Sequence, residues 1–423
     1  MSKFVIKGGT PLEGTIHADG AKNAAVAIVP AALLAGGTVT IEKLPYIDDV
    51  LILKDIVCNL GARADLTEEG TMVVDPKGVN TYVADYELVS KMRASYYLLS
   101  VLLHKFGRAE VALPGGCEIG QRPIDQHIKG FERLGAKVEI EHGMIRVIAP
   151  TGGLKGAEIY LDVVSVGATI NIMLAAALAQ GNTTIVNAAK EPHIVDVANF
   201  LNVMGANIKG AGTDTIRIKG VREFRSSNIE YSVIPDQIET GTLMIAAAAT
   251  RGDVTINHAI PTHMEALSAK LMEAGVEIEN GEESIRVCAK NKVVERVNIK
   301  TLPYPGFPTD LQQPMTSLLT TAKGTSTIVE SIFEDRFKHT FELRRMGAII
   351  TVESKVAVVE GVSRLTGANV TATDLRAGAA LMIAGLMADG ITTISNVKYI
   401  DRGYHRFEEK LAQIGADIKR VED

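Results

Sequence analysis

The chain has 423 residues, of which 46% are hydrophobic and 22% charged, and its formal net charge is −6 at pH 7. A chain of this length can bury large cores and is expected to form two domains. The acidic balance argues against a nonspecific nucleic-acid-binding surface, which requires a basic face.

The cysteines and the apolar runs indicate the compartment. Cys58, Cys117 and Cys288 are an odd number at wide spacing, which is typical of a reducing cytosol and not of a disulfide framework. Residues 1–9 contain no signal-peptide apolar region. The longest apolar runs, near 24–35 and 377–388, are shorter than the roughly 20 residues that span a bilayer. We therefore expect a cytoplasmic protein that binds no membrane.

An internal repeat organises the chain. Glycines in a similar amphipathic pattern, such as Leu60-Gly61-Ala62, recur six times at intervals of 68 to 74 residues. Each is preceded by another glycine that ends an apolar run and opens a β-branched stretch. The first glycines are Gly37, Gly107, Gly181, Gly252, Gly324 and Gly390, and the second ones are Gly61, Gly135, Gly205, Gly275, Gly347 and Gly415. This regularity indicates six copies of one supersecondary unit.

Each repeat is predicted to contain an apolar helix, a strand, a second helix and another strand. In the sixth repeat, 379–387 is an apolar helical run, Gly390 ends it, and 391–394 is rich in β-branched residues. We expect the glycines to mark left-handed helix ends.

The first apolar helix is predicted to open with a cation and an amide. Lys22 and Asn23 stand at its start, beside backbone N–H groups that no helical carbonyl satisfies. Arg93 precedes the next apolar helix. A solvated lysine and an ion-paired surface arginine are the structural alternatives.

The second repeat contains the most informative segment, Leu113-Pro114-Gly115-Gly116-Cys117-Glu118-Ile119-Gly120-Gln121-Arg122-Pro123. The two glycines of this repeat are 28 residues apart, against 23 to 25 in the others, and the added length lies in this loop. Glycines let a backbone approach a ligand, and a nearby guanidinium favours a thiolate. An inert packing thiol is the alternative, but it would not need an insertion. We therefore predict that Cys117 takes part in chemistry.

Two later helices open with aspartates. Asp310 precedes one helix, and Asp374 and Arg376 open another. An N-cap is the structural alternative for both aspartates. A capping carboxylate can still act as a base.

Three arginines occupy corresponding places in different repeats. Arg122, Arg336 and Arg402 lie in the strand-to-helix connections of the second, fifth and sixth repeats. Equivalent positions in a repeat tend to face a common place, and converging guanidinium groups suit a substrate with phosphate and carboxylate groups. The chain has no Walker loop, no strand-linked GxGxxG, no HExxH and no spaced histidine or cysteine pairs, so we predict no metal site.

Six segments of the chain carry a family resemblance. They are the Cys117 loop, Lys22-Asn23, Ser165-Val166-Gly167, Phe307-Pro308-Thr309-Asp310, Thr373-Asp374-Leu375-Arg376 and Asp401-Arg402-Gly403-Tyr404. In these segments the chain resembles the enolpyruvyl transferases. The resemblance covers essentially the whole sequence. It implies an α/β (α+β) fold of six βαβαββ-type units in two inside-out domains. The first domain is 22–234 and the second is 1–21 plus 235–423, with the active site in the cleft between them.

The resemblance also implies a reaction, in which enolpyruvyl passes from phosphoenolpyruvate to the 3'-hydroxyl of UDP-N-acetylglucosamine and phosphate is released. This is the first committed step of peptidoglycan precursor synthesis, and it needs no cofactor. By the same resemblance, Cys117 is the general acid, the residue that carries a covalent phosphoenolpyruvate adduct and the target of the epoxide fosfomycin, and Asp310 is the base.

Substrate contacts are likewise implied by the resemblance. Lys22 and Arg402 join Cys117 and Asp310 as catalytic residues. The phosphoenolpyruvate site comprises Lys22, Asn23, Arg122, Arg336, Arg376 and Arg402. The nucleotide-sugar site comprises Asn23, Arg93, Arg122, Pro123, Ile124, Asp125, Gln126, Ser165, Val166, Gly167, Asp310 and Ile332. This chain departs from the family pattern at Val163-Val164 and at Glu118.

Three alternatives remain at this point. One is the branch of the family that uses shikimate 3-phosphate as acceptor, which lacks a cysteine acid in such a loop. Another is a low-activity paralogue, and the last is a relative of RNA 3'-phosphate cyclases that binds RNA. The acidic balance disfavours the RNA-binding alternative.

Overall fold

The computed structural model describes residues 2–84, 86–90, 92–113, 123–226 and 228–422. These residues form two compact units. We call 20–113 with 123–234 the N-terminal unit, and 2–19 with 235–422 the C-terminal unit. Each unit has its own hydrophobic core.

Three small mixed sheets belong to the N-terminal unit. Their strand orders are β13-β3-β5-β4, β6-β8-β7 and β11-β12-β10-β9. A single parallel bridge between Val83 and Glu110 extends the second of them. The strands are β3 (Val39–Glu42), β4 (Arg63–Leu66), β5 (Met72–Asp75), β6 (Arg108–Ala112), β7 (Lys137–Glu141), β8 (Met144–Ile148), β9 (Glu158–Tyr160), β10 (Asn182–Val186), β11 (Asn207–Lys209), β12 (Thr215–Lys219) and β13 (Ile229–Ser232).

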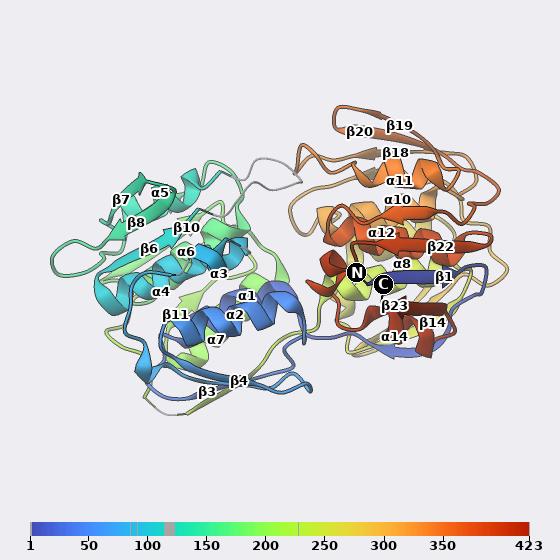
Figure 1. Cartoon of the computed structure of the whole chain (residues 1–423). Coiled ribbons are helices and arrows are strands. Elements are labelled where there is room, and N and C mark those ends of the chain that lie inside the picture. Colours follow the sequence, from blue (N-terminus) through green and yellow to red (C-terminus); the bar gives the residue numbers. More distant parts are fainter. Residues whose placement is uncertain (1, 85, 91, 114–122, 227, 423) are drawn as a thin grey trace. The chain divides into compact units, whose positions relative to one another are not determined.

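Three more mixed sheets belong to the C-terminal unit, in the orders β15-β16-β14-β2, β17-β18-β20-β19 and β21-β22-β1-β23. The strands are β1 (Lys3–Lys7), β2 (Glu13–His17), β14 (Asp253–Asn257), β15 (Glu277–Asn280), β16 (Ser284–Cys288), β17 (Ile299–Lys300), β18 (Thr325–Val329), β19 (Ile349–Glu353), β20 (Val356–Glu360), β21 (Asn369–Thr371), β22 (Ile391–Ser395) and β23 (Asp417–Val421). The first strand of the chain lies between two of the last, antiparallel to both, with Val5 opposite Thr393 and Lys419 (Figure 1).

The sheets share one pattern. Each of the five four-stranded sheets contains one parallel pair, such as β13 with β3, and two antiparallel pairs, such as β5 with β3 and with β4. The predicted sixfold repetition of strand and helix is confirmed. The sequence pattern did not predict the second strand of each hairpin. It also did not predict the short strand that pairs in parallel at the edge of each four-stranded sheet.

The first helix of every repeat is a core helix: α1 (Lys22–Ala32), α4 (Tyr97–Phe106), α6 (Val166–Ala176), α8 (Gln237–Ala249), α10 (Gln312–Leu319) and α12 (Leu375–Met387). The second helices are α2 (Asp48–Asn59), α5 (Asp125–Arg133), α7 (Pro192–Met204), α9 (Glu265–Glu273), α11 (His339–Arg345) and α14 (Phe407–Gln413). Shorter helices are α3 (Tyr86–Val89), α13 (Lys398–Asp401) and the 3-10 turns η1 (Pro76–Gly78), η2 (Arg93–Tyr96), η3 (Pro261–Met264) and η4 (Thr309–Leu311).

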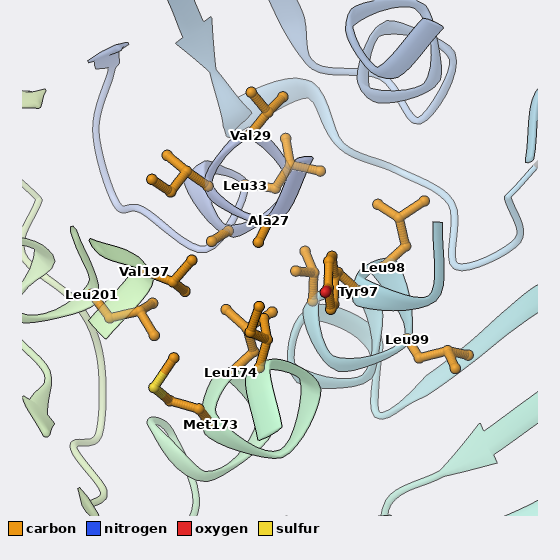
Figure 2. Close-up of a cluster of buried hydrophobic side chains, with 14 of the residues drawn as sticks. Ala27, Val29, Leu33, Tyr97, Leu98, Leu99, Met173, Leu174, Val197 and Leu201 are labelled. Atoms are coloured by element: carbon orange, nitrogen blue, oxygen red, sulfur yellow. The ribbon is translucent and has the colours of Figure 1, made fainter. Parts of the chain in front are cut away.

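The core helices are buried almost all round, which explains their continuous apolar sequences. Every residue of α8 from Ile238 to Ala249 is buried, as is every residue of α12 from Arg376 to Leu386. In the N-terminal unit, side chains of α1, α4, α6 and α7, among them Ala27, Tyr97, Leu174 and Val197, face a common centre (Figure 2).

Ten of the twelve glycines have the expected left-handed conformation, and seven of these lie within two residues of a helix end. Gly181, Gly324 and Gly390 are left-handed but follow their helices by three to five residues. Gly61, for example, has a φ of 101° and follows α2, and Gly107 has a φ of 70° at the end of α4. Gly37 and Gly252 are the exceptions, since neither has positive φ. Beside Gly252, the residue with left-handed conformation is Arg251, with a φ of 58°. A Cβ on Gly252 would lie 2.1 Å from the carbonyl oxygen of Leu12. Close packing, not a helix end, requires glycine at 252.

Candidate active site

Asp310 lies at the centre of a charged cluster in the C-terminal unit. It belongs to η4, immediately before α10. Arg336 Nη2 donates a hydrogen bond to its Oδ1 at 2.8 Å, and Arg376 donates to its Oδ2 from Nε at 3.2 Å and from Nη2 at 3.0 Å. Both guanidinium groups are buried, whereas the carboxylate is 26% exposed. A substrate can thus reach the carboxylate, and its partners are fixed by packing.

Asp310 and Asp374, for which the sequence allowed an N-cap role, differ in what their carboxylates bind. Asp374 is the N-cap of α12, and it accepts hydrogen bonds from the backbone N–H groups of Arg376 and Ala377. Asp310 does not cap its helix, because Pro308 and Leu311 occupy the cap positions of η4 and α10. The carboxylate of Asp310 binds side chains instead.

The charge of Asp310 is stabilised by its neighbours. Burial alone would raise the pKa of Asp310, but the positive charges of Arg376 and Arg336, with their hydrogen bonds, outweigh burial and hold that pKa well below its usual range. The carboxylate is therefore ionised at neutral pH and accepts hydrogen bonds.

Arg376 is itself held from a second side. Its Nη1 donates to the Tyr404 hydroxyl at 3.0 Å, and that hydroxyl lies 2.9 Å from Thr242 Oγ1 on α8. The Tyr404 ring packs against Phe407, with 4.6 Å between ring centroids. The guanidinium group thus connects η4 to α8 and to the segment that precedes α14.

Arg336 has hydrogen-bond donors that are not satisfied within the described residues. It is 2% exposed, and its Nε and Nη1 have no hydrogen-bond partner among the described residues. Gln313 Nε2 donates to the Arg336 carbonyl oxygen and to Asp374 Oδ2, both at 3.2 Å. His339 is fully buried nearby, and burial lowers its pKa to about 4, although the charge of Asp374 opposes this. A neutral His339 leaves the positive charge of this cluster on the arginines.

Two further predicted residues of the C-terminal unit lie in connecting segments. Arg402 is half-buried at the C-cap of α13, next to Asp401, which accepts hydrogen bonds from Arg420 at 3.0 and 2.6 Å. Ile332 is half-buried in the turn after β18, and its backbone N–H donates to Glu330 Oε1 at 2.8 Å.

In the N-terminal unit, Lys22 is the first residue of α1 and forms an ion pair with Asp49 of α2, with 2.8 Å between Nζ and Oδ2. Asn23 follows it and is half-buried. The lysine that could have been merely solvated is 12% exposed and ion-paired.

The predicted nucleotide-sugar residues of this unit lie at the starts of α5 and α6. Pro123 and Ile124 precede α5, Asp125 opens it, and Gln126 exchanges hydrogen bonds with Asp162, from Nε2 to Oδ2 at 3.2 Å and from the Asp162 backbone N–H to Oε1 at 2.9 Å. Ser165 caps α6 and accepts from the Ala168 N–H at 3.3 Å, and Val166 begins the helix. A Cβ on Gly167 would lie 2.9 Å from His127 Nε2, so close packing requires glycine there.

Some predicted residues cannot be placed. Cys117, Glu118 and Arg122 lie outside the described residues, and Arg93 is described only through its backbone in η2. The structure therefore brings Asp310, Arg336 and Arg376 together in one unit, and Lys22, Asn23, 123–126 and 165–167 belong to the other. Within the described ranges, no group of three histidine, cysteine or acidic side chains is arranged to hold a metal ion. The helices of those ranges include none with the length and apolar character of a membrane span.

Sequence reasoning missed the residues that support the cluster. The sequence motif Asp401-Arg402-Gly403-Tyr404 contains Tyr404, but no role was predicted for this tyrosine. No role was predicted for Gln313 or Glu330 either. No signal in the sequence marks Gln313 as buried, because it lies beside Gln312 at the start of α10, a short helix that also contains Thr316 and Ser317.

Comparison with known proteins identifies the family. Residues 6–411 match the family model of EPSP synthase (3-phosphoshikimate 1-carboxyvinyltransferase). The chain is 58% identical over 423 residues to a UDP-N-acetylglucosamine 1-carboxyvinyltransferase of Clostridium botulinum, and 56% identical over 423 residues to UDP-N-acetylglucosamine 1-carboxyvinyltransferase 3 of Caldanaerobacter subterraneus; both alignments cover 100% of each chain.

Solved structures share the fold. The enolpyruvyl transferase NikO of Streptomyces tendae matches with a TM-score of 0.88 and 27% identity over 99% of both chains. EPSP synthase of Acinetobacter baumannii matches with a TM-score of 0.76 at 19% identity over 100% of both chains, a likeness of fold alone. The predicted fold class is confirmed. The chain belongs to the family of UDP-N-acetylglucosamine 1-carboxyvinyltransferases, a branch of the enolpyruvyl transferases.

Proposed function

We propose that this chain transfers the enolpyruvyl group of phosphoenolpyruvate to the 3'-hydroxyl of UDP-N-acetylglucosamine and releases inorganic phosphate, the first committed step of peptidoglycan precursor synthesis. Full-length relatives at 56 to 58% identity that are named for this activity support the proposal. The observation that carries it in the structure is the Asp310 carboxylate, ionised and held between two buried guanidinium groups.

The reaction requires a positioned acid and a positioned base. In the addition step, the Cys117 thiol gives its proton to C3 of phosphoenolpyruvate while the sugar oxygen forms a bond to C2, and Asp310 accepts the proton of the sugar hydroxyl. In the elimination step, the Cys117 thiolate takes a proton back from C3, the bond from C2 to the phosphate oxygen breaks, and inorganic phosphate leaves. Cys117 can also add to C2 and hold the group as a covalent adduct.

Asp310 suits the role of base only if its environment changes. A carboxylate whose pKa lies far below its usual range is a weak base. Phosphoenolpyruvate carries phosphate and carboxylate groups, which compete for the guanidinium groups of Arg336 and Arg376. Binding of the anion would then weaken the hold of the arginines on Asp310 and raise its basicity as the sugar hydroxyl arrives.

The other site residues are assigned to the two substrates. Lys22, Asn23, Arg122, Arg336, Arg376 and Arg402 would bind phosphoenolpyruvate and stabilise the charge that develops on it. Asn23, Arg93, residues 122–126 and 165–167, Asp310 and Ile332 would bind the nucleotide sugar. The two sets come from both units, and exclusion of water from the bound substrates would protect the intermediate.

Phosphate release tests the proposal. Release should require both UDP-N-acetylglucosamine and phosphoenolpyruvate, and pretreatment with fosfomycin should block it. Cys117→Asp should keep part of the activity, because a carboxylic acid can also donate a proton, and should resist fosfomycin. Release with shikimate 3-phosphate as the only acceptor would contradict the assigned substrate, and rapid inactivation of the Cys117→Asp variant would contradict the assigned thiol.

A further inference from the structure

Glu330 is a buried carboxylate that no step of the proposed reaction uses. It follows β18 directly and is 1% exposed. Its Oε1 accepts hydrogen bonds from Thr301 Oγ1 at 2.8 Å, from the Ile332 N–H at 2.8 Å and from the Phe333 N–H at 3.2 Å. Its Oε2 accepts one from Thr309 Oγ1 at 2.9 Å. These four donors are hydroxyl and backbone groups without charge.

The donors belong to the two segments that present the Asp310 cluster. Thr309 precedes Asp310 in η4, and Ile332 and Phe333 begin the segment that ends at Arg336. Because Arg336 Nη2 donates to Asp310 Oδ1 at 2.8 Å, the two segments are joined twice. Glu330 joins them at the base, and the ion pair joins them at the substrate-facing end.

Glu330 is costly as a space-filling residue. Removing a carboxylate from water costs several kcal/mol unless hydrogen bonds replace its hydration. An apolar side chain would fill the same volume without that cost. Each oxygen of Glu330 instead holds a different segment, with the turn at 332–333 on Oε1 and η4 on Oε2. The arrangement fixes the distance between η4 and the turn.

We propose that Glu330 is a positioning residue of the transfer reaction, which sets the place of the Asp310 carboxylate relative to Ile332 and Arg336 through its hydrogen bond with Thr309. The inference rests on the proposed role of Asp310 as the base. A displacement of about 1 Å in a reacting group can reduce a rate by about a hundredfold, so the hydroxyl of Thr309 should matter to turnover although it is not among the proposed substrate contacts.

Substitutions at Thr309 test the link. Thr309→Val keeps the shape of the side chain and removes the donor, and kcat should fall by about tenfold or more. Thr309→Ser restores a hydroxyl and should return kcat to within about threefold of the parent chain. Glu330→Gln should cost less kcat than Thr309→Val, since its carbonyl oxygen can still accept from the 332–333 backbone while its amide N–H donates to the Thr309 hydroxyl.

The matched control is Thr250→Val. It removes a buried threonine hydroxyl of the C-terminal unit, one that accepts from the Leu12 N–H at 3.2 Å and donates to the Ala246 carbonyl oxygen at 2.9 Å. Its melting temperature should fall about as much as that of Thr309→Val, with kcat unchanged. Unchanged kcat in Thr309→Val, or an equal loss of kcat in Thr250→Val, would overturn the inference.

Asp310→Asn separates the inference from the function on which it rests. A large loss of kcat in that variant, together with full turnover in Thr309→Val, would refute the positioning role alone. Full turnover in Asp310→Asn would refute Asp310 as the base, and the role of Glu330 with it. The inference stands if Asp310→Asn and Thr309→Val both lose turnover and Thr309→Ser regains it.

Discussion

At the scale of single residues, the cluster around Asp310 shows how a charged group is kept both buried and usable. The guanidinium group of Arg376 is buried, yet it has an oxygen partner on each side, Asp310 and Tyr404. Burial raises the pKa of the Tyr404 hydroxyl, although the charge of Arg376 opposes this. The tyrosine therefore stays neutral and orients the arginine without cancelling its charge.

Tyr404→Phe should weaken phosphoenolpyruvate binding. The ring and its contact with Phe407 remain, but Arg376 Nη1 loses its acceptor. A buried donor left without a partner costs about 1–3 kcal/mol. Arg376 should then lose its fixed orientation, and the KM for phosphoenolpyruvate should rise severalfold in steady-state assays of phosphate release.

Thr242→Val provides the comparison for this variant. It removes the other partner of the Tyr404 hydroxyl and leaves the bond from Arg376 in place. Its melting temperature should fall by a similar amount, with a smaller rise in KM. Equal KM values in the two variants would show that the tyrosine acts on stability and not on Arg376.

At the scale of elements, the openings of the core helices couple local structure to the site. Asp374 caps α12 through the N–H groups of Arg376 and Ala377, at 2.9 and 3.0 Å, and Gln313 of α10 donates to its other oxygen at 3.2 Å. The cap thus fixes the first turn of the helix that carries Arg376, and it connects that turn to the neighbouring core helix.

Asp374→Ala should lower both stability and activity. Loss of an N-cap costs about 1 kcal/mol, within a range of about 0.5–2 kcal/mol. The first turn of α12 should loosen and misplace Arg376, so kcat/KM for phosphoenolpyruvate should fall more than stability alone predicts. Asp374→Asn keeps an acceptor for both backbone groups and should retain most of the melting temperature and of kcat/KM. An alanine variant with normal kinetics would show that the cap is only structural.

The sequence predicted elements better than it predicted the contacts between them. The glycine spacing revealed six repeats because a helix that ends in the left-handed region strongly favours glycine, as at Gly107. The same local reasoning allowed a cap at Asp374. It could not pair Asp310 with Arg336 or Arg376, which lie 26 and 66 residues away in the sequence. Only the topology brings such residues together.

The buried supporting residues were the hardest to predict. Glu330 and Gln313 belong to residue types that are mostly exposed, and one sequence gives no sign that they are buried. The family resemblance named residues expected to contact substrates and gave no account of what holds them. It implied that 1–21 belongs with 235–423, but it did not supply the pairing of β1 with β22 and β23.

At the scale of the whole molecule, the chain passes between its two units at 19–20 and at 234–235. Next to each crossing, a buried carboxylate accepts a backbone hydrogen bond. Glu239 accepts from the Asp19 N–H at 2.7 Å, and Asp196 accepts from the Ile234 N–H at 3.3 Å. The segments at the crossings are therefore anchored within their own units, and the protonation of these carboxylates bears on stability.

Asp196 should make the stability of the N-terminal unit depend on pH. Burial raises the pKa of Asp196 to about 6, although hydrogen bonds from the Tyr231 hydroxyl at 2.5 Å and from Ile234 oppose the rise. Below the unfolded pKa of about 4, both states hold the proton. Between about pH 4 and 6 only the folded state holds it, so stability falls as pH rises, by about 3 kcal/mol in all.

Asp196→Asn cannot ionise and should remove this dependence. In urea unfolding followed by circular dichroism, the stability of the variant relative to the parent chain should improve by about 2 kcal/mol between pH 4 and pH 7. Tyr231→Phe should do the reverse, because loss of its hydrogen bond raises the pKa of Asp196 further and steepens the decline. Parallel pH profiles for the three proteins would show that Asp196 titrates alike in the folded and unfolded chain, and that its burial does not govern its charge.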